Sequence, residues 1–490
     1  MSQSPQTESK SASINRAKLE ALSEVDRSLR FPAGFFMINA ALWLVLANVI
    51  TLVSSLQSYY PEFLSSLEWL TYGRLYPVAT NALFFGWGCN AIFAVSLWLI
   101  ARLSLSPVRD GGLLMIAGVF WNLGLTIGLL GVIAGDTTAA EFLELPGYST
   151  PILLIAYTLI GAWGVLAFNS RKEKAVGVSQ WYIIGALFCF PWIYTIAQFM
   201  VVWFPARGVV QPIIGSWFLG SFMNLWFTPV ALAVAYYIIP KILGRPIYSH
   251  ALALFGFCSL LLVGSWTGLA RLTGGPIPVW LSSISIVALV VMIIPMITVV
   301  INLFFTVKDV FAGMWRSLAL RFILFGMIAY LIFGIASAVL AFHSLNEIVQ
   351  FTAIVPGQTW LLFYAFFSMV VFGGLYFMAP RLSGREWPST DLIHLHFWGS
   401  SVGIMILVLS MFLSGWISGT QMNVADVVFI EIVQSTVIWS KVSVIGFICL
   451  LVGNVSFLIN FLGMLVAGHR VNSKEGAALL ESGHQQTSAS

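Results

Sequence analysis

The six histidines are the side chains in this sequence most suited to chemistry, because imidazole is the usual ligand for haem iron, copper and zinc. His394 and His396 are two residues apart, so on a helix they would point about 200° apart and could not easily share one metal. The other four are separated along the chain, near the ends of apolar segments or close to the C-terminus: His250, His343, His469 and His484. This spacing predicts structural histidines and no site with three or four converging ligands.

The cysteines give the same indication. All four lie inside apolar runs, and no pair has CxxC spacing: Cys89, Cys189, Cys258 and Cys449. We expect small buried side chains and neither a metal site nor a disulfide.

The composition defines the class of protein that carries these residues. Of the 490 residues, 59% are hydrophobic and only 9% are charged, whereas a soluble domain has about 25% charged residues. Such a chain cannot solvate a water-facing surface. The composition predicts a polytopic membrane protein in contact with lipid, and excludes a cytosolic enzyme, a disordered protein and a nucleic-acid binder.

Twelve apolar runs are long enough to cross a membrane core of about 30 Å as helices, and none alternates like a barrel strand. The predicted fold is therefore an all-α bundle of twelve transmembrane helices within residues 31–468. A polar cytoplasmic tail is expected at 1–30 and a disordered cytoplasmic tail at 469–490. The twelve runs lie near residues 32–56, 77–102, 111–134, 150–169, 181–204, 212–240, 249–270, 278–305, 317–342, 357–379, 392–416 and 435–466.

Basic residues predict the orientation. All but four of the 23 Lys and Arg fall in the terminal tails and the even-numbered connections, which places both termini on the cytoplasmic side of an inner (plasma) membrane. The exceptions are Arg74, Arg207, Arg271 and Lys441. Arg271 and Lys441 lie deepest, and we expect them to extend to the outer interface, with a buried or functional pairing as the alternative.

A series of short motifs, in order along the chain, resembles subunit I of the cbb3-type haem–copper cytochrome c oxidases. The series covers the chain from about residue 30 to 466, and the family core also has twelve spans. The motifs are Tyr72-Gly73-Arg74-Leu75-Tyr76-Pro77, Thr80-Asn81-Ala82, Phe190-Pro191-Trp192, Tyr236-Tyr237 to Pro240-Lys241, Gly244-Arg245-Pro246-Ile247-Tyr248, Gly384-Arg385-Glu386, His396-Phe397-Trp398 and Ser414-Gly415-Trp416.

The sequence departs from this family at the positions where the resemblance implies haem ligands. Active members hold a low-spin haem between a histidine on the second span and one on the tenth, and the tenth span also supplies the ligand of the high-spin haem. The position on the second span is Ala79, and the tenth span has Gln358 and Trp360 where His-x-His is expected. A neutral amide oxygen is a weak iron ligand, so the resemblance implies that both haems lack their ligands.

The copper positions are also changed. The resemblance implies one copper histidine on the sixth span and a pair on the seventh, which in this sequence are Gly220, Trp266 and Thr267. The active-site tyrosine of the family falls near Leu260. No metal or cofactor is therefore expected.

If the haems are absent, side chains should fill their space, because lost packing contacts are costly. We expect Trp266 and Trp360 to be buried toward the bundle centre, and the next candidates are Trp217, Trp226 and Phe222.

Three functional hypotheses remain open. The first is a ligand-free homologue of the oxidase core subunit, a non-catalytic scaffold or accessory subunit of a membrane respiratory complex, with a c-type cytochrome or another respiratory subunit as its partner. The second is an active terminal oxidase or nitric-oxide reductase that holds haem b and copper through unusual ligands. The third is a small-molecule transporter that uses the former haem cavity.

Overall fold

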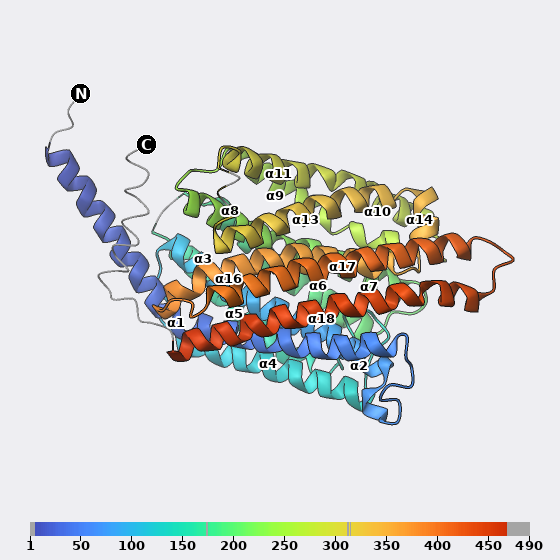
Figure 1. The fold of residues 1–490 in the computed structure, drawn as a ribbon. Helices are drawn as coiled ribbons and strands as arrows, with labels where there is room; N and C mark the ends of the chain where they lie inside the picture. The colour runs from blue at the N-terminus through green and yellow to red at the C-terminus, as the bar shows by residue number, and fades with distance from the viewer. Residues whose placement is uncertain (1–4, 173–174, 311–312, 314, 468–490) are drawn as a thin grey trace.

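The computed structural model describes residues 5–172, 175–310, 313 and 315–467, with the backbone alone for residues 5–17. Within these residues, twelve helices are long and apolar enough to cross a membrane, and no strand occurs. The long helices run side by side in one bundle (Figure 1). The predicted all-α fold with twelve spans is confirmed, and the chain is an integral membrane protein. The predicted tail 469–490 lies outside the described residues.

Several spans are made of more than one helical segment. In order along the chain, the spans are α1 (Pro5–Gln57); α2 (Tyr72–Asn81), η2 (Ala82–Gly88) and α3 (Cys89–Ser104); α4 (Gly111–Ala134); α5 (Thr150–Asn169); α6 (Val178–Ala197) and η3 (Gln198–Trp203); α7 (Val210–Ser221), η4 (Phe222–Phe227) and α8 (Thr228–Leu243); α9 (His250–Gly264) and η5 (Thr267–Leu272); α10 (Val279–Val291) and α11 (Ile293–Val307); α13 (Leu318–Leu340); α15 (Ile354–Trp360), η6 (Leu361–Ser368) and α16 (Met369–Ser383); α17 (Thr390–Met422); and α18 (Phe429–Ala467). Two short helices, η1 (Glu68–Leu70) and α14 (His343–Val349), lie in connections.

The second, sixth and tenth spans form the centre of the bundle. In their most apolar stretches, 100, 94 and 100% of the residues are buried, whereas the other nine spans bury between 33 and 50%. Large apolar side chains on the outer spans, such as Leu262, Phe188 and Val466, are exposed. Such residues are suited to contact with lipid, so three central helices are enclosed by a ring of lipid-facing ones.

Each central span contains a π-helical segment: η2, η4 and η6. These segments bring aromatic rings together on the bundle axis, where the centroid of Phe363 lies 4.1 Å from that of Phe84 and 4.9 Å from that of Phe227. The indole nitrogen of Trp87 in η2 donates to the hydroxyl of Ser368 in η6 at 2.9 Å. Single-turn π segments are rare and often mark functional sites, so the centre of the bundle is where a site is expected.

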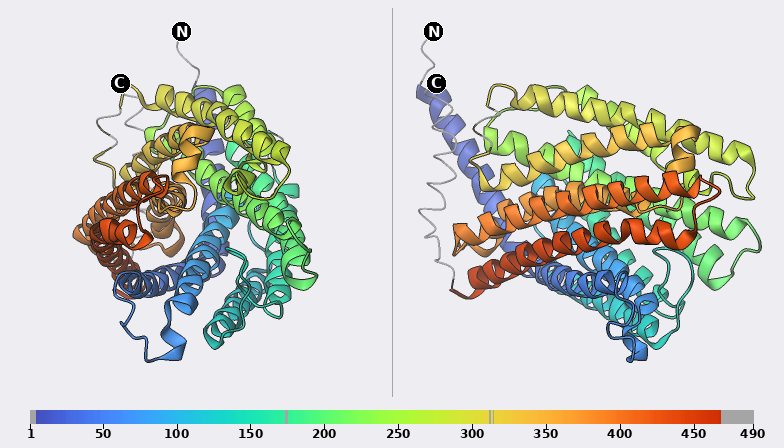
Figure 2. Two further views of the ribbon diagram at one scale, coloured as in Figure 1. Left: turned by 90° about the vertical axis from the view of Figure 1, so that its right-hand side faces the viewer. Right: turned by 45° about the vertical axis from the view of Figure 1, so that its right-hand side comes forward.

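The segment predicted as a polar tail, residues 1–30, is helical from Pro5 onward and continuous with the first span. Helix α1 begins at Pro5 and continues through the first span, and Val25 and Leu29 are buried in the core. Asp26 forms an ion pair with Arg102 of α3 and accepts a 2.9 Å hydrogen bond from the Trp98 indole. The helix changes direction as it joins the bundle (Figures 1 and 2). An apolar face and a buried ion pair therefore anchor the last part of the predicted tail.

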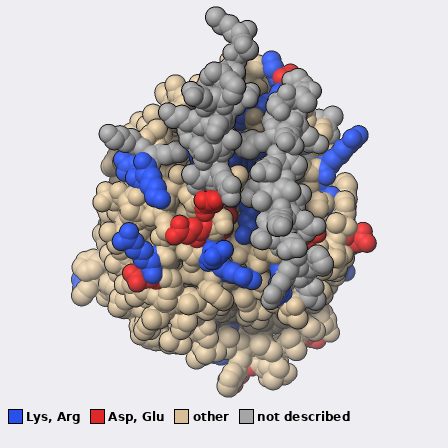
Figure 3. Space-filling model, turned by 90° about the vertical axis from the view of Figure 1, so that its left-hand side faces the viewer, with Lys and Arg blue, Asp and Glu red and all other residues tan. Residues whose placement is uncertain are grey.

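The two ends of the bundle differ in charge. The end at which α1 joins the bundle, here called the proximal end, carries several Lys and Arg side chains across its surface (Figure 3). Arg171, Arg245 and Arg385 lie in connections on this side, directly after α5, α8 and α16. The opposite end, where α1 ends and α2 begins, is called the distal end below.

Glycines permit the closest helix contacts. A Cβ atom built on Gly220 of α7 would lie 2.5 Å from the backbone nitrogen of Gly268 in η5, and one built on Gly268 would overlap the carbonyl of Ser216. Real Cβ atoms do not approach backbone so closely, so both positions require glycine. The sixth and seventh spans are therefore in direct backbone contact.

We predict that Gly220→Ala lowers the free energy of unfolding by about 1–3 kcal/mol, because the added methyl group forces α7 and η5 apart. Gly215 is the matched control: it lies in the same helix, and a Cβ built on it would have no neighbour within 4 Å. Gly215→Ala should leave stability unchanged or raise it slightly through helix propensity. Thermal unfolding of the purified full chain in detergent measures both variants. An equal effect of the two substitutions would contradict the inferred contact.

Candidate functional site

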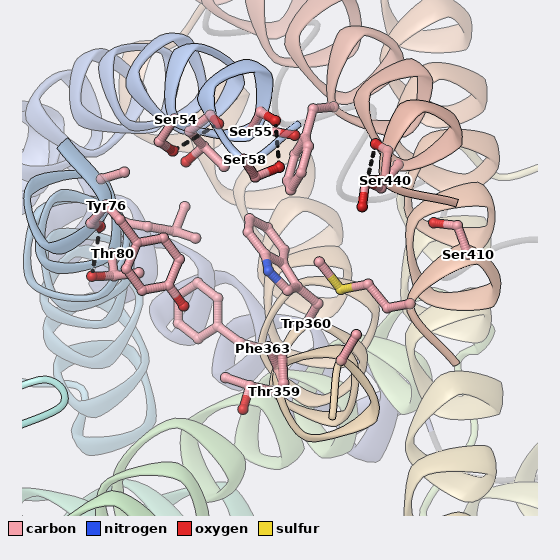
Figure 4. Close-up of a pocket in the computed structure, with 18 of the residues that line it drawn as sticks. Ser54, Ser55, Ser58, Tyr76, Thr80, Thr359, Trp360, Phe363, Ser410 and Ser440 are labelled. Carbon is pink, nitrogen blue, oxygen red and sulfur yellow. Dashed lines mark hydrogen bonds between the residues drawn. The ribbon is translucent and has the colours of Figure 1, made fainter. Parts of the chain in front are cut away.

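Two cavities contain the residues that sequence analysis identified as former ligand positions. The first, called the hydroxyl-lined cavity, has a volume of about 270 Å³ and is lined by Ala79 and Trp360. It lies at the distal end, where the ends of α1 and α2 meet α15, α17 and α18. Figure 4 shows Trp360 and Phe363 in its centre, with serine and threonine side chains around them.

The second cavity, called the Asn224 cavity, has a volume of about 110 Å³ and lies between the sixth, seventh, ninth and tenth spans. Gly220, Thr267 and Gln358 line it. The structure thus brings Gly220, Thr267 and Gln358 together in the Asn224 cavity. Ala79 and Trp360 lie together in the neighbouring hydroxyl-lined cavity.

Gly220 and Thr267, which the family resemblance assigned to copper positions, take part in helix packing and hydrogen bonds. The amide nitrogen of Asn224 donates to the carbonyl of Gly220 at 3.1 Å and to the hydroxyl of Thr267 at 3.0 Å. The Thr267 hydroxyl in turn donates to the carbonyl of Gly264 at 3.0 Å. The buried Oδ1 atom of Asn224 has no partner in the structure. These hydrogen bonds join η4 to the seventh span.

Trp266 does not fill the bundle centre, so the expectation for this residue is wrong. Its side chain is 43% exposed and lines neither cavity. The reason is local: α9 ends at Gly264, and Trp266 precedes the 3₁₀ helix η5, so the register of one continuous helix does not apply. Trp360 is partly buried, with its ring 5.3 Å from that of Phe447.

Phenylalanines from the π-helical segments occupy the centre instead. Phe84, Phe222, Phe227 and Phe363 are all buried and in mutual ring contact. Of the lower-ranked candidates, Trp226 and Phe222 are fully buried, whereas Trp217 is partly buried against Trp192. Leu260, at the position of the family tyrosine, is fully buried.

An ion pair lies where three cavities meet. Arg271 Nη1 is 3.1 Å from Glu141 Oε2, and Arg271 Nη2 donates to the Thr359 hydroxyl at 3.0 Å. Glu141 lines the hydroxyl-lined cavity, Arg271 lines the Asn224 cavity, and both line a wider vestibule of about 610 Å³. Arg271 is therefore paired, but the pair is only partly buried, since the Arg271 side chain is 28% exposed and that of Glu141 is 50% exposed. Lys441 is exposed, with its Nζ 5.9 Å from the centre of the Tyr59 ring, as expected for a side chain that extends to the interface.

Glu144, on the connection between α4 and α5, is a buried acid. Its Oε2 accepts a 2.8 Å hydrogen bond from the amide of Asn81. Burial raises the pKa of Glu144 to about 7, and the hydrogen bond from Asn81 opposes part of this shift. Glu144 therefore titrates near neutral pH. Its partner Asn81 lies on the same helix as Ala79.

The described histidines lie away from both cavities. His396 is fully buried, and its Nδ1 is 2.8 Å from the hydroxyl of Tyr376; His394 Nδ1 is 2.7 Å from Arg321 Nη1. His250 and His343 line neither cavity. Among the residues that the structure describes, no three His, Cys, Asp or Glu side chains gather in a group that could hold a metal.

The sequence matches the family "Cytochrome C and Quinol oxidase polypeptide I" over residues 32–449. Similar proteins include the cbb3-type cytochrome c oxidase subunit CcoN1 of Stutzerimonas stutzeri, which is 26% identical over 457 residues, or 89% of this chain and 92% of that protein. A cytochrome c oxidase subunit 1 homolog of Azorhizobium caulinodans is 25% identical over 465 residues, or 90% and 83%.

A solved haem–copper terminal oxidase dimer has a similar fold, with a TM-score of 0.74 at 15% identity over 90% of this chain and 84% of that one. The fold and the sequence match together define a subunit I bundle of the haem–copper oxidase type. The chain belongs to the cytochrome c and quinol oxidase polypeptide I family, and its relatives include cbb3-type subunits.

The residues in the two cavities do not fit the haem and copper of that family. A Cβ atom on Gly220 would already collide with the backbone of Gly268, so no ligating side chain fits there. Ala79 offers a methyl group, and the indole nitrogen of Trp360 is a donor only. The Met411 thioether is the one sulfur atom that lines the hydroxyl-lined cavity, and one thioether is not a set of axial ligands for haem iron.

Sequence reasoning did not find Asn224, Glu144 or the Arg271–Glu141 pair. A signal existed for Asn224, because a polar side chain inside an apolar span must find a partner. The ion pair joins residues 130 positions apart in the chain. A single sequence does not indicate which residues so far apart come into contact. No periodic pattern in the sequence indicated the π-helical segments η2, η4 and η6 either.

We predict that Glu144 makes stability fall as the pH rises. Because the folded-state pKa is near 7 and the unfolded value is about 4.3, the folded chain binds the proton more tightly. The stabilisation is complete below about pH 4 and is lost between the two values, by about 3 kcal/mol above pH 7.

Glu144→Gln should remove this loss, so the variant should unfold at a higher temperature than the parent at pH 8 and at a similar temperature at pH 4.5. Asp136→Asn is the control, since Asp136 is exposed on the same connection. Thermal unfolding between pH 4.5 and 8 measures the difference. Asp136→Asn should keep the fall with pH that the parent shows. A parent profile that is flat or rises across this range, or a fall that persists in Glu144→Gln, would rule out a buried acid with a raised pKa.

Proposed function

We propose that this chain is a homologue of the oxidase core subunit without a metal centre, and that it serves as a non-catalytic scaffold or accessory subunit of a membrane respiratory electron-transfer complex. The observation that carries the proposal is the contact between Gly220 and Gly268. Backbone occupies the space in which a copper ligand at position 220 would have to lie. A fold can persist after its catalytic site is lost.

The hydrogen bonds of the site support the same proposal. Thr267 is engaged by Asn224 and Gly264, so its hydroxyl already holds the sixth span against the seventh. Phe84, Phe227 and Phe363 pack on the bundle axis. The central spans are thus stabilised by contacts between side chains, and their packing has no need of a haem.

The proposed setting follows from charge and from the relatives. Basic residues gather at the proximal end, which favours a cytoplasmic location of this end and of both termini in a plasma membrane. Similar proteins are named as cytochrome c oxidase subunits. A c-type cytochrome or another respiratory subunit is therefore the partner class that we propose.

The test is the haem and copper content of the full chain, purified from a host that makes active cbb3-type oxidase. We expect less than about 0.1 haem and 0.1 copper per chain, because no axial ligand pair is available. The pyridine haemochrome spectrum and metal analysis measure these values. One or two haems per chain would overturn the proposal and favour an oxidase with unusual ligands. Affinity purification from the native membrane, followed by haem staining, tests for the cytochrome partner.

We further predict that Ala79→His alone does not give stoichiometric haem. The new imidazole would lack a second axial ligand, because Gln358 lies in the other cavity and Trp360 cannot ligate iron. Ala79→His combined with Trp360→His is the comparison, since both positions line one cavity, and it should bind more haem than either single variant. A bis-histidine spectrum at one haem per chain from Ala79→His alone would contradict this assignment of the tenth span.

A further inference from the structure

A third cavity, called the basic cavity, lies at the proximal end of the bundle and has a volume of about 360 Å³. It is formed where α3 and α8 end and where α6 and α9 begin. Lys241, Arg245 and His250 line it, and none of the described residues in its wall is Asp or Glu. The cavity therefore presents basic and neutral groups, which favour an anion.

The turn at the end of α8 positions the two cationic side chains. Gly244 has a left-handed φ of 64° and ends the helix. The N–H group of Arg245 then donates to the carbonyl of Pro240 at 3.2 Å, so the chain stays against the last turn of α8, which carries Lys241. Backbone geometry therefore places Lys241 and Arg245 in the wall of one cavity.

Neither cation is neutralised by a buried acid. Arg245 Nη1 is 3.4 Å from Asp309 Oδ2, but both side chains are largely exposed, and exposed ion pairs are weak. The charged side chains that act on Lys241 are all cationic: Arg102, Lys18 and Arg381. The cavity therefore keeps an excess of positive charge.

The rest of the wall offers hydrogen-bond donors. Val178 and Ser179 are the first two residues of α6, and both line the cavity. The first N–H groups of a helix have no acceptor within the helix, and the helix dipole favours an oxyanion beside them. Tyr236 also lines the cavity; it is 4% exposed, and its hydroxyl makes no hydrogen bond to a described residue. These donors suit the oxygen atoms of a phosphate group.

The surroundings of the basic cavity are apolar and suited to lipid. Trp181 lies in the first turn of α6 and is partly exposed, and tryptophan is enriched at the interface between lipid and water. Its ring centroid is 6.4 Å from that of Phe257, so α6 and α9 are in contact here. Further along these two helices, Phe188 and Phe255 are exposed. An apolar surface on α6 and α9 thus leads away from the cavity.

We propose that the basic cavity binds the headgroup of an anionic phospholipid, with its phosphate at Lys241, Arg245 and the first turn of α6 and its acyl chains along α6 and α9. Basic pockets between membrane helices suit such headgroups. The volume of about 360 Å³ is sufficient for a phosphate and glycerol group, since a cavity of about 150 Å³ accommodates benzene. The site lies at the opposite end of the bundle from Ala79 and Trp360, so it is independent of the proposed function.

The test compares two lipids that share their acyl chains and differ in headgroup charge. The full chain, purified in detergent and stripped of lipid, is incubated with equal amounts of dioleoylphosphatidylglycerol and dioleoylphosphatidylcholine, and native mass spectrometry measures the bound lipid. Phosphatidylglycerol should be preferred by at least about fivefold, because each basic side chain near an anionic lipid strengthens binding by roughly this factor. Equal retention of the two lipids, or of neither, would overturn the proposed ligand class.

Paired variants test the location. Lys241→Gln with Arg245→Gln removes both cations of the cavity and should lower the preference to less than about twofold. Arg109→Gln with Arg316→Gln is the matched control, which removes the same net charge and should keep the preference: both arginines are in proximal connections, and neither lines the cavity. All four side chains are exposed, so the fold is preserved. An equal loss in the two paired variants would indicate diffuse attraction to the basic surface and overturn the location.

Inorganic phosphate separates a lipid from a soluble anion. An excess of phosphate at constant ionic strength should leave the bound phosphatidylglycerol in place, because acyl chains add apolar contacts that phosphate lacks. Loss of the lipid preference on addition of phosphate would assign the cavity to a soluble anion and overturn the lipid site.

Discussion

Three helices that are buried on all faces constrain everything else in this bundle. A helix enclosed by other helices has no lipid or water to accommodate a bulky side chain, so each close approach must be met by a small residue or by an interlocking ring. The Gly220–Gly268 contact is the first solution, and the cluster of Phe84, Phe227 and Phe363 is the second. The nine surrounding spans need only one apolar face toward these three.

Under the proposed function, the same constraint explains how the bundle holds together through its own side chains. Here the contacts are made by side chains and by direct bonds, such as that from Trp87 to Ser368 between the second and tenth spans. Half of the residues that line the cavity at the distal end carry a hydroxyl group.

Much of the architecture could be predicted from the sequence, because membrane helices are long and their apolar signal is strong. The predicted spans 111–134 and 150–169 coincide with α4 and α5. The first span was underestimated because its early part carries many charges, although Val25 and Leu29 continue the apolar face that leads to Ala33. A helical segment with mixed charge and a narrow apolar face cannot be recognised as part of a membrane span from its average hydropathy.

The site was predictable only where backbone continuity holds. Ala79 and Trp360 lie within helices α2 and α15, and both line the hydroxyl-lined cavity. Trp266 follows a helix end, and there the assumed register fails. The pairing of Arg271 with Glu141 depends on the packing of distant segments, and the raised pKa of Glu144 depends on burial by a connection.

The Gly220–Gly268 contact has a historical consequence. A single codon change at position 220 cannot restore a metal ligand, because the first carbon of any new side chain would meet the backbone nitrogen of Gly268. The seventh span would have to move outward first, and the bonds that Asn224 makes to Thr267 and Gly220 oppose that movement. Reversal would require several coordinated changes, each without benefit until the others are present. Under the proposed function, a copper position at residue 220 could therefore not be regained by one substitution.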